Sequence, residues 1–77
     1  MSPGKLRLAW RVAVGAAMDR ATAVALLNGG VVEVAAEDLT WRREVKRLDA
    51  MIVSRLQYFV GADSVTKLKV VARPSKG

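Results

Sequence analysis

Cationic side chains crowd one short stretch of this 77-residue chain. Residues 41–48 read WRREVKRL and hold four of the 13 lysines and arginines, namely Arg42, Arg43, Lys46 and Arg47. Guanidinium and ammonium groups at this density bind phosphate oxygens, because they neutralise charge and release counterions. The same stretch can instead be the solvated, salt-bridged face of an amphipathic helix. The residue types leave both interpretations open.

Acidic neighbours account for part of this charge. At the spacing of adjacent helical turns, three of the cations have an acid within reach, and the possible pairs are Asp38–Arg42, Glu44–Arg47 and Asp49–Lys46. Arg43 has no such partner. Arg43 also lies four residues before Arg47, and like charges at that spacing repel. A salt-bridged helix face therefore explains much of the pattern but leaves Arg43 without a role.

A second group of cations lies near the end of the chain. In residues 66–73, TKLKVVAR, the cations Lys67 and Lys69 alternate with Leu68 and Val70. This period of two indicates a strand that shows its lysines to solvent. Together with the net charge of +6, the pattern favours a polyanionic partner. We expect phosphate contacts from six residues: Arg42, Arg43, Lys46, Arg47, Lys67 and Lys69.

The chain offers little chemistry for catalysis. It has no histidine and no cysteine, and its seven acids are scattered, so the commonest general base and the usual zinc ligands are missing. Glu37 and Asp38 are adjacent, but capping the following helix is their simpler role. No phosphate-cradling GxxxxGKS or GxxxxGKT segment occurs. We therefore expect a protein that is not an enzyme and has no metal, cofactor or small-molecule substrate.

The cations of residues 41–48 belong to the strongest helical pattern in the sequence. Apolar residues recur there at steps of three and four, at Trp41, Val45, Leu48, Ile52, Leu56 and Phe59. Asp38 can cap this helix and Gly61 can end it. We expect one continuous helix of five turns over residues 39–60. Its apolar ridge should face the interior and leave the guanidinium groups in water.

The remaining elements complete an α+β domain. A helix is predicted over residues 5–20, and strands over residues 22–27, 31–35 and 66–73. The first two strands are joined by a turn at either Asn28–Gly29 or Gly29–Gly30. The predicted order is helix–strand–strand–helix–strand, which gives a three-stranded sheet with both helices on one face. A single domain should span residues 5–73, with residues 1–4 and 74–77 as flexible ends. The first helix should bury a stripe made of Leu6, Trp10, Ala13 and Ala17.

The few aromatic side chains offer little base stacking. Trp10, Trp41 and Phe59 lie on the apolar stripes and are expected in the core, whereas Tyr58 is the one candidate for stacking. Backbone contact with DNA therefore fits the chain better than base-specific readout. RNA binding at the ribosome is an alternative, because phosphate contacts do not distinguish the two polymers. A further alternative is a protein-interaction module, such as a homodimer, whose spare sheet face carries Leu27, Val31 and Val71.

The order of several short motifs resembles the DciA-type helicase operators of bacterial replication. Trp10, residues 14–18 (VGAAM) and Thr22 are similar to the first-helix pattern of that family, in which a tryptophan precedes Val-Gly and a His-Thr pair follows. The hairpin glycines, residues 31–34, residues 38–45 and residues 68–71 continue the resemblance, which covers residues 6–72. Ala21 stands where the family usually has histidine.

This resemblance implies a KH-like α+β domain that binds DNA, single- or double-stranded, and assists loading of the replicative helicase. The family commonly carries a long basic extension, of which this sequence has almost none. The GxxG loop with which true KH domains clamp a nucleic-acid backbone is also absent. No segment approaches the roughly 20 apolar residues of a membrane span, so we expect no membrane partner and a cytoplasmic, nucleoid-associated protein.

Overall fold

A computed structural model describes residues 2–73 of the chain. The elements follow in the order α1 (Pro3–Val14), α2 (Ala16–Ala21), β1 (Ala23–Leu27), the 3-10 turn η1 (Asn28–Gly30), β2 (Val31–Ala36), α3 (Leu39–Arg47), α4 (Asp49–Val60) and β3 (Lys67–Ala72). The predicted α+β class and the order helix–strand–strand–helix–strand are confirmed. Each of the two predicted helices, however, is divided into two.

The three strands form a mixed sheet in the order β1-β2-β3. β1 pairs with β2 in the antiparallel sense, and β2 pairs with β3 in the parallel sense. Leu27 is opposite Val31, so the hairpin turn contains three residues, and neither predicted two-residue turn is correct. Gly29 and Gly30 both have positive φ, 77° and 74°, a conformation that glycine adopts at little cost.

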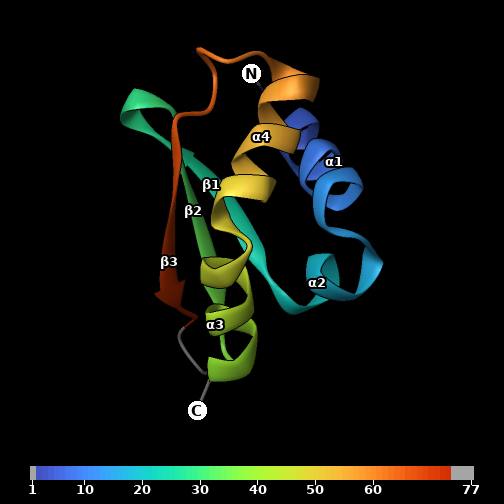
Figure 1. Ribbon diagram of the computed structural model, residues 1–77, viewed down its shortest axis with the longest axis vertical. Coiled ribbons are helices and arrows are strands. Elements are labelled where there is room, and N and C mark those ends of the chain that lie inside the picture. Colours follow the sequence, from blue (N-terminus) through green and yellow to red (C-terminus); the bar gives the residue numbers. More distant parts are fainter. Residues whose placement is uncertain (1, 74–77) are drawn as a thin grey trace.

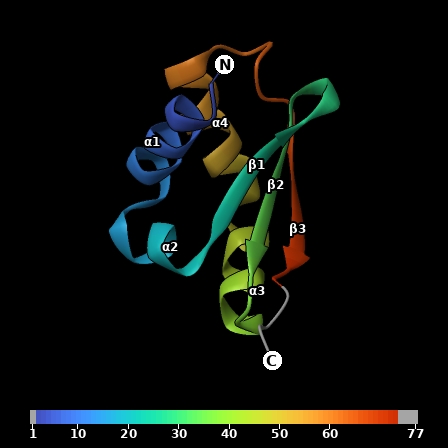
Figure 2. The same ribbon diagram turned by 180° about the vertical axis from the view of Figure 1, so that it is seen from behind.

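All the helices cover the same face of the sheet, as predicted (Figures 1 and 2). Because side chains alternate along a strand, β2 turns Val32, Val34 and Ala36 towards the helices, and all three are fully buried. The helices and the loop before β3 supply the rest of the core. Its largest fully buried side chains outside the sheet are Trp10, Val45, Ile52, Leu56 and Val65.

The first predicted helix ends at Gly15. This glycine has φ 88° and ψ 166°, a region of backbone conformation that is essentially restricted to glycine. α2 then begins in a new direction, so that Met18 is buried whereas Ala17, which we expected in the core, is exposed. α1 also begins earlier than the predicted residue 5, because Pro3 and Gly4 belong to its first turn. Residues 1 and 74–77 lie outside the described residues.

A buried hydrogen-bonded pair fastens α2 and the start of β1 to α1. The indole Nε1 of Trp10 donates to Oγ1 of Thr22 at 2.9 Å, and the same hydroxyl donates to the carbonyl of Met18 at 2.7 Å. Trp10 is 1% exposed and Thr22 is 6% exposed. Every polar side-chain atom of this pair is therefore satisfied without water, as burial requires.

The second predicted helix is interrupted at Leu48, which has φ −97° and ψ 9°. The prediction of a continuous helix is therefore wrong. The interruption allows α3 to pack against β2 and β3, while α4 packs against α1 and β3. The apolar ridge predicted for this helix still faces the interior, because Val45, Ile52 and Leu56 are fully buried. Phe59, expected in the core, is 45% exposed, because it lies on the last turn of α4 near the edge of the core.

Candidate nucleic-acid interface

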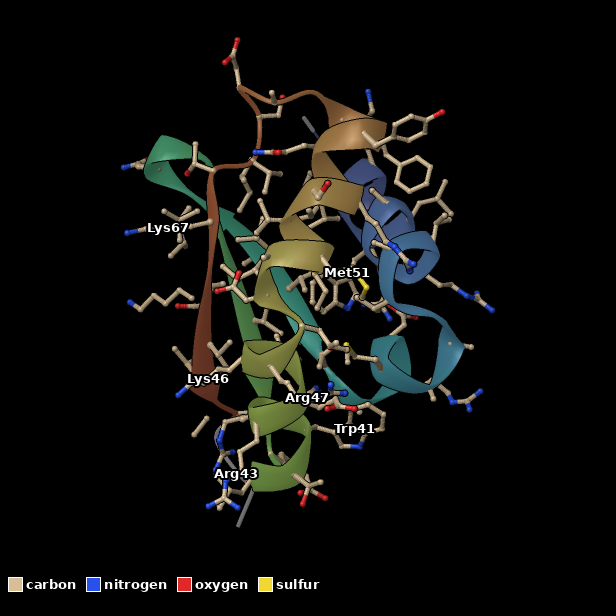
Figure 3. The ribbon with its side chains drawn as sticks, viewed as in Figure 1. Trp41, Arg43, Lys46, Arg47, Met51 and Lys67 are labelled. Atoms are coloured by element: carbon tan, nitrogen blue, oxygen red, sulfur yellow. The ribbon has the colours of Figure 1, made fainter. Side chains whose placement is uncertain are left out.

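Four of the six predicted phosphate-binding residues lie around the free edge of β3. Arg43 and Lys46 come from the helix-covered side of the sheet, and Lys67 and Lys69 lie on its open face, in register with Val31 and Glu33. Figure 3 shows Lys46 and Lys67 beside β3, and Arg43 at the lower end of the molecule, where α3 begins. Lys69 lies two residues after Lys67 on β3 and therefore points to the same face of the sheet. All four side chains are exposed. We call this group, which α3 and β3 provide together, the basic surface.

No acid neutralises these four cations through an ion pair within residues 2–73, because the ion pair found there is Arg47–Glu44. The possible pair Asp49–Lys46 is not formed. Two carboxylates lie near them without forming an ion pair: Glu33 is opposite Lys69 in the register of β2 and β3, and Asp49 lines a depression together with Lys46 and Lys67. The basic surface therefore keeps a net positive charge.

A shallow depression extends along this surface between α4 and the start of β3. It has a volume of about 540 Å³, and Lys46 and Lys67 are among its lining residues. Ala50 and Ser54 contribute small side chains from the outer face of α4. Gln57 also lines the depression, but its Nε2 already donates to the carbonyl of Val65 at 2.8 Å. The depression thus offers three cations, Lys46, Arg47 and Lys67, against one acid, Asp49, so its lining carries a net positive charge.

Arg42 has a different position from the one predicted. Its Nη1 donates to the carbonyl oxygens of Ala36 at 2.6 Å and Glu37 at 2.8 Å. Asp38 does not pair with Arg42, and instead its Oδ1 accepts from the amide of Thr40 at 2.7 Å, which confirms the predicted cap. The guanidinium of Arg42 therefore fastens α3 to the end of β2.

Arg47 lies on α3 near Trp41 (Figure 3). Its Nε donates to Oε1 of Glu44 at 2.7 Å, which confirms the predicted pair. This hydrogen bond from Arg47 lowers the pKa of the Glu44 carboxyl and raises that of the Arg47 guanidinium. Both groups lie at the surface, so the pair contributes little to stability. The structure therefore engages Arg42 in hydrogen bonds to the main chain. Arg47 is paired with Glu44, but it also lines one depression with Arg43 and another with Lys46 and Lys67.

The aromatic residues divide between the core and the surface. Trp10 is buried, as predicted, and Trp41 is partly buried against the core. Tyr58 is 86% exposed, and its ring meets that of Phe59 edge to face, with the ring centroids 5.5 Å apart. These two exposed rings belong to the last turns of α4.

Among the residues that the structure describes, no three acidic, histidine or cysteine side chains gather where they could hold a metal ion. None of the helices in residues 2–73 has the length and apolar character needed to cross a membrane.

The fold and the surface define a class: a small, basic α+β domain whose exposed cations gather beside one strand. A family model described as "Dna(CI) antecedent, DciA" matches residues 2–70, and the chain belongs to the DciA family. It is 36% identical over 63 residues to a UPF0232 protein of Mycolicibacterium smegmatis, and the match covers 80% of this chain. The chain spans 32% of that relative's length. No solved structure matches the chain.

The family match includes the residues of the first-helix motif, Trp10, Gly15, Met18 and Thr22. The structure also gives a physical reason for the first-helix motif. Trp10 and Thr22 are hydrogen-bonded to each other, Gly15 provides the break between α1 and α2, and Met18 is buried next to them. The motif therefore specifies how α1, α2 and β1 meet.

Proposed function

We propose that this chain is a non-enzymatic accessory protein of bacterial DNA replication that binds DNA and contacts the replicative helicase. The observation that supports DNA binding is the basic surface. Arg43 and Lys46 come from α3, Lys67 and Lys69 come from β3, and none of the four has an ion-pair partner in the described chain. The observation that supports a replication role is the family match over residues 2–70.

The chemistry of this surface favours the sugar-phosphate backbone as its ligand. Four separate cations neutralise phosphates, and binding through four phosphates gives a slope of log K against log salt of roughly −3.6 for duplex DNA and roughly −2.8 for a single strand. Exposed aromatic rings for base stacking do not accompany these cations. Recognition should therefore depend on salt and tolerate many sequences.

Fluorescence anisotropy of labelled single-stranded and duplex DNA at several salt concentrations tests DNA binding. Replacing Lys67 and Lys69 by alanine should weaken binding and make the salt slope shallower by roughly 1 for each lost phosphate contact. The matched control replaces Lys5 and Arg20 by alanine, which removes the same charge from exposed positions on α1 and α2. Absence of binding at low salt, or an equal change in the control, would contradict the proposal.

A further inference from the structure

A second exposed surface, apolar rather than basic, lies where α1 and α4 meet. It carries five of the large hydrophobic side chains that the fold leaves in solvent: Leu8 (66% exposed), Val12 (56%), Met51 (39%), Tyr58 (86%) and Phe59 (45%). We call these five residues the α1–α4 patch. Single exposed apolar residues are ordinary, but a group of them marks a binding surface.

Helical geometry groups four of the five residues, and Tyr58 joins them through its edge-to-face contact with Phe59. Leu8 and Val12 are one turn apart on α1, and Met51 and Phe59 are two turns apart on one flank of α4. Arg55, which is midway between Met51 and Phe59, donates from Nη1 to the carbonyl of Ala13 at 3.1 Å. This hydrogen bond shows that the same flank of α4 borders α1. Figure 3 likewise shows Met51 on the side of α4 that is near α1 and α2.

The charges around the patch have one predominant sign. Arg7 and Arg11 on α1 and Arg55 on α4 are exposed, and none of them forms an ion pair in the described chain. One acid, Asp19, borders this surface, because it lines a depression together with Leu8, Arg7 and Arg11. A partner that fits the patch should therefore be apolar at its centre and acidic at its edges.

The patch and the basic surface lie on different sides of the molecule. α1 and β3 are on opposite sides of α4 in both views (Figures 1 and 2). Apolar side chains such as Leu8 and Val12 gain nothing from phosphates, so DNA is a poor occupant of the patch. A second copy is also a poor occupant, because a symmetric contact would bring the arginines of the two copies together.

We propose that the α1–α4 patch is where this protein docks on the replicative helicase, against a surface with an apolar centre and an acidic border. This inference rests on the proposed function, since the helicase is the partner proposed there. It adds that the helicase and DNA use separate surfaces. The protein can then hold both at the same time.

Binding of the whole chain to the purified replicative helicase of the same organism, with nuclease present, tests this inference. The variant Leu8→Gln plus Val12→Gln leaves the charge unchanged and uses a residue that favours helices. Loss of two central contacts should weaken helicase binding roughly tenfold or more, and DNA binding should be unchanged. Leu39→Gln is the matched control, because Leu39 is 50% exposed on α3, outside the patch.

The reciprocal variant, Lys67→Ala plus Lys69→Ala, should lose DNA affinity and keep helicase affinity. If the variant Leu8→Gln plus Val12→Gln binds the helicase as strongly as the wild type does, the α1–α4 patch is not the docking surface. The proposed function is unaffected by that result. A wild-type chain that does not bind the helicase would overturn the helicase contact itself. A dimer of this chain that Leu8→Gln plus Val12→Gln dissociates would assign the patch to a second copy and refute the inference.

Discussion

Replacing Thr22 by valine should remove a large part of the stability of this domain. Valine has the shape of threonine without its hydroxyl, and the extended backbone at this position (φ −133°, ψ 159°) suits a β-branched residue. The substitution therefore changes two hydrogen bonds and little else. It leaves the indole N–H of Trp10 without its acceptor and the carbonyl of Met18 without the hydroxyl donor.

The burial of this site sets the size of the effect. An unsatisfied buried polar group costs about 1–3 kcal/mol, and Trp10 is 1% exposed, so water cannot replace the lost acceptor. We expect a loss of about 2–3 kcal/mol in the free energy of unfolding, against the roughly 3–5 kcal/mol that one core of this size supplies. At about 4–8 °C per kcal/mol, the Tm should fall by roughly 10–20 °C.

Urea denaturation followed by far-UV circular dichroism measures this loss. Thr66→Val is the matched control, because the Thr66 hydroxyl also donates to a carbonyl, that of Gly29 at 2.7 Å, but at an exposed position. Water can replace that bond, so the control should cost less than about 1 kcal/mol. If Thr22→Val costs no more than Thr66→Val, the reasoning from buried hydrogen bonds is refuted.

Three further predictions concern single residues. Gly15→Ala should destabilise the domain by about 1–3 kcal/mol, because Gly15 has a φ of 88°. Gly4→Ala, inside α1, should instead stabilise it by about 0.5–1 kcal/mol. Thermal unfolding that shows Gly15→Ala to be the more stable variant would contradict the prediction. Arg42→Gln should lower the free energy of unfolding by about 1 kcal/mol, because the hydrogen bonds to the carbonyls of Ala36 and Glu37 are lost. Arg43→Gln should change the free energy of unfolding by less than about 0.5 kcal/mol. Arg47 lowers the pKa of Glu44 in the folded state. Their pair therefore stabilises the fold at pH values above the pKa that Glu44 has in the unfolded chain, and this stabilisation is lost as the pH falls through the lower pKa that Glu44 has in the folded chain. An NMR titration should therefore show the pKa of Glu44 rising in Arg47→Gln, and an unchanged pKa would disprove the pairing.

The sequence predicted the parts of the fold that depend on periodicity. The alternation of Lys67 and Lys69 with Leu68 and Val70 located β3 and its outward-facing lysines correctly, and the glycines located the hairpin. Asp38 as a helix cap and the pair Glu44–Arg47 also followed from spacing alone. These features are local, and local preferences determine them.

The helix interruptions were missed for two different reasons. Gly15 was a visible signal, because a glycine near the end of a helical pattern often takes positive φ and stops the helix. At Leu48 there was no signal, since residues 47–49 contain neither glycine nor proline, and tertiary packing alone divides α3 from α4. The α1–α4 patch was also missed, although Leu8 and Val12 show the spacing of four that places two residues on one face of a helix.

The hydrogen bonds of Arg42 could not be predicted from spacing. The acid Asp38 is four residues away, which suggested an ion pair. The carbonyls of Ala36 and Glu37 become available only because β2 ends beside the first turn of α3. The position at which β2 ends therefore decides that Arg42 binds the main chain and not solvent. The spacing of residues in the sequence does not predict that position.

The interruption at Leu48 separates two helical segments, α3 and α4, that carry different exposed side chains. The segment that carries Arg43 and Lys46 ends there, and the segment that carries Met51 and Phe59 begins. Through residues 49–51, no main-chain hydrogen bond runs back from α4 to α3 in the described chain. Leu48 still links both segments through its main chain, because its amide donates to the carbonyl of Glu44 at 3.1 Å and its carbonyl accepts from the amide of Ile52 at 2.9 Å. A change in the angle between α3 and α4 would therefore have to act on the backbone of this one residue.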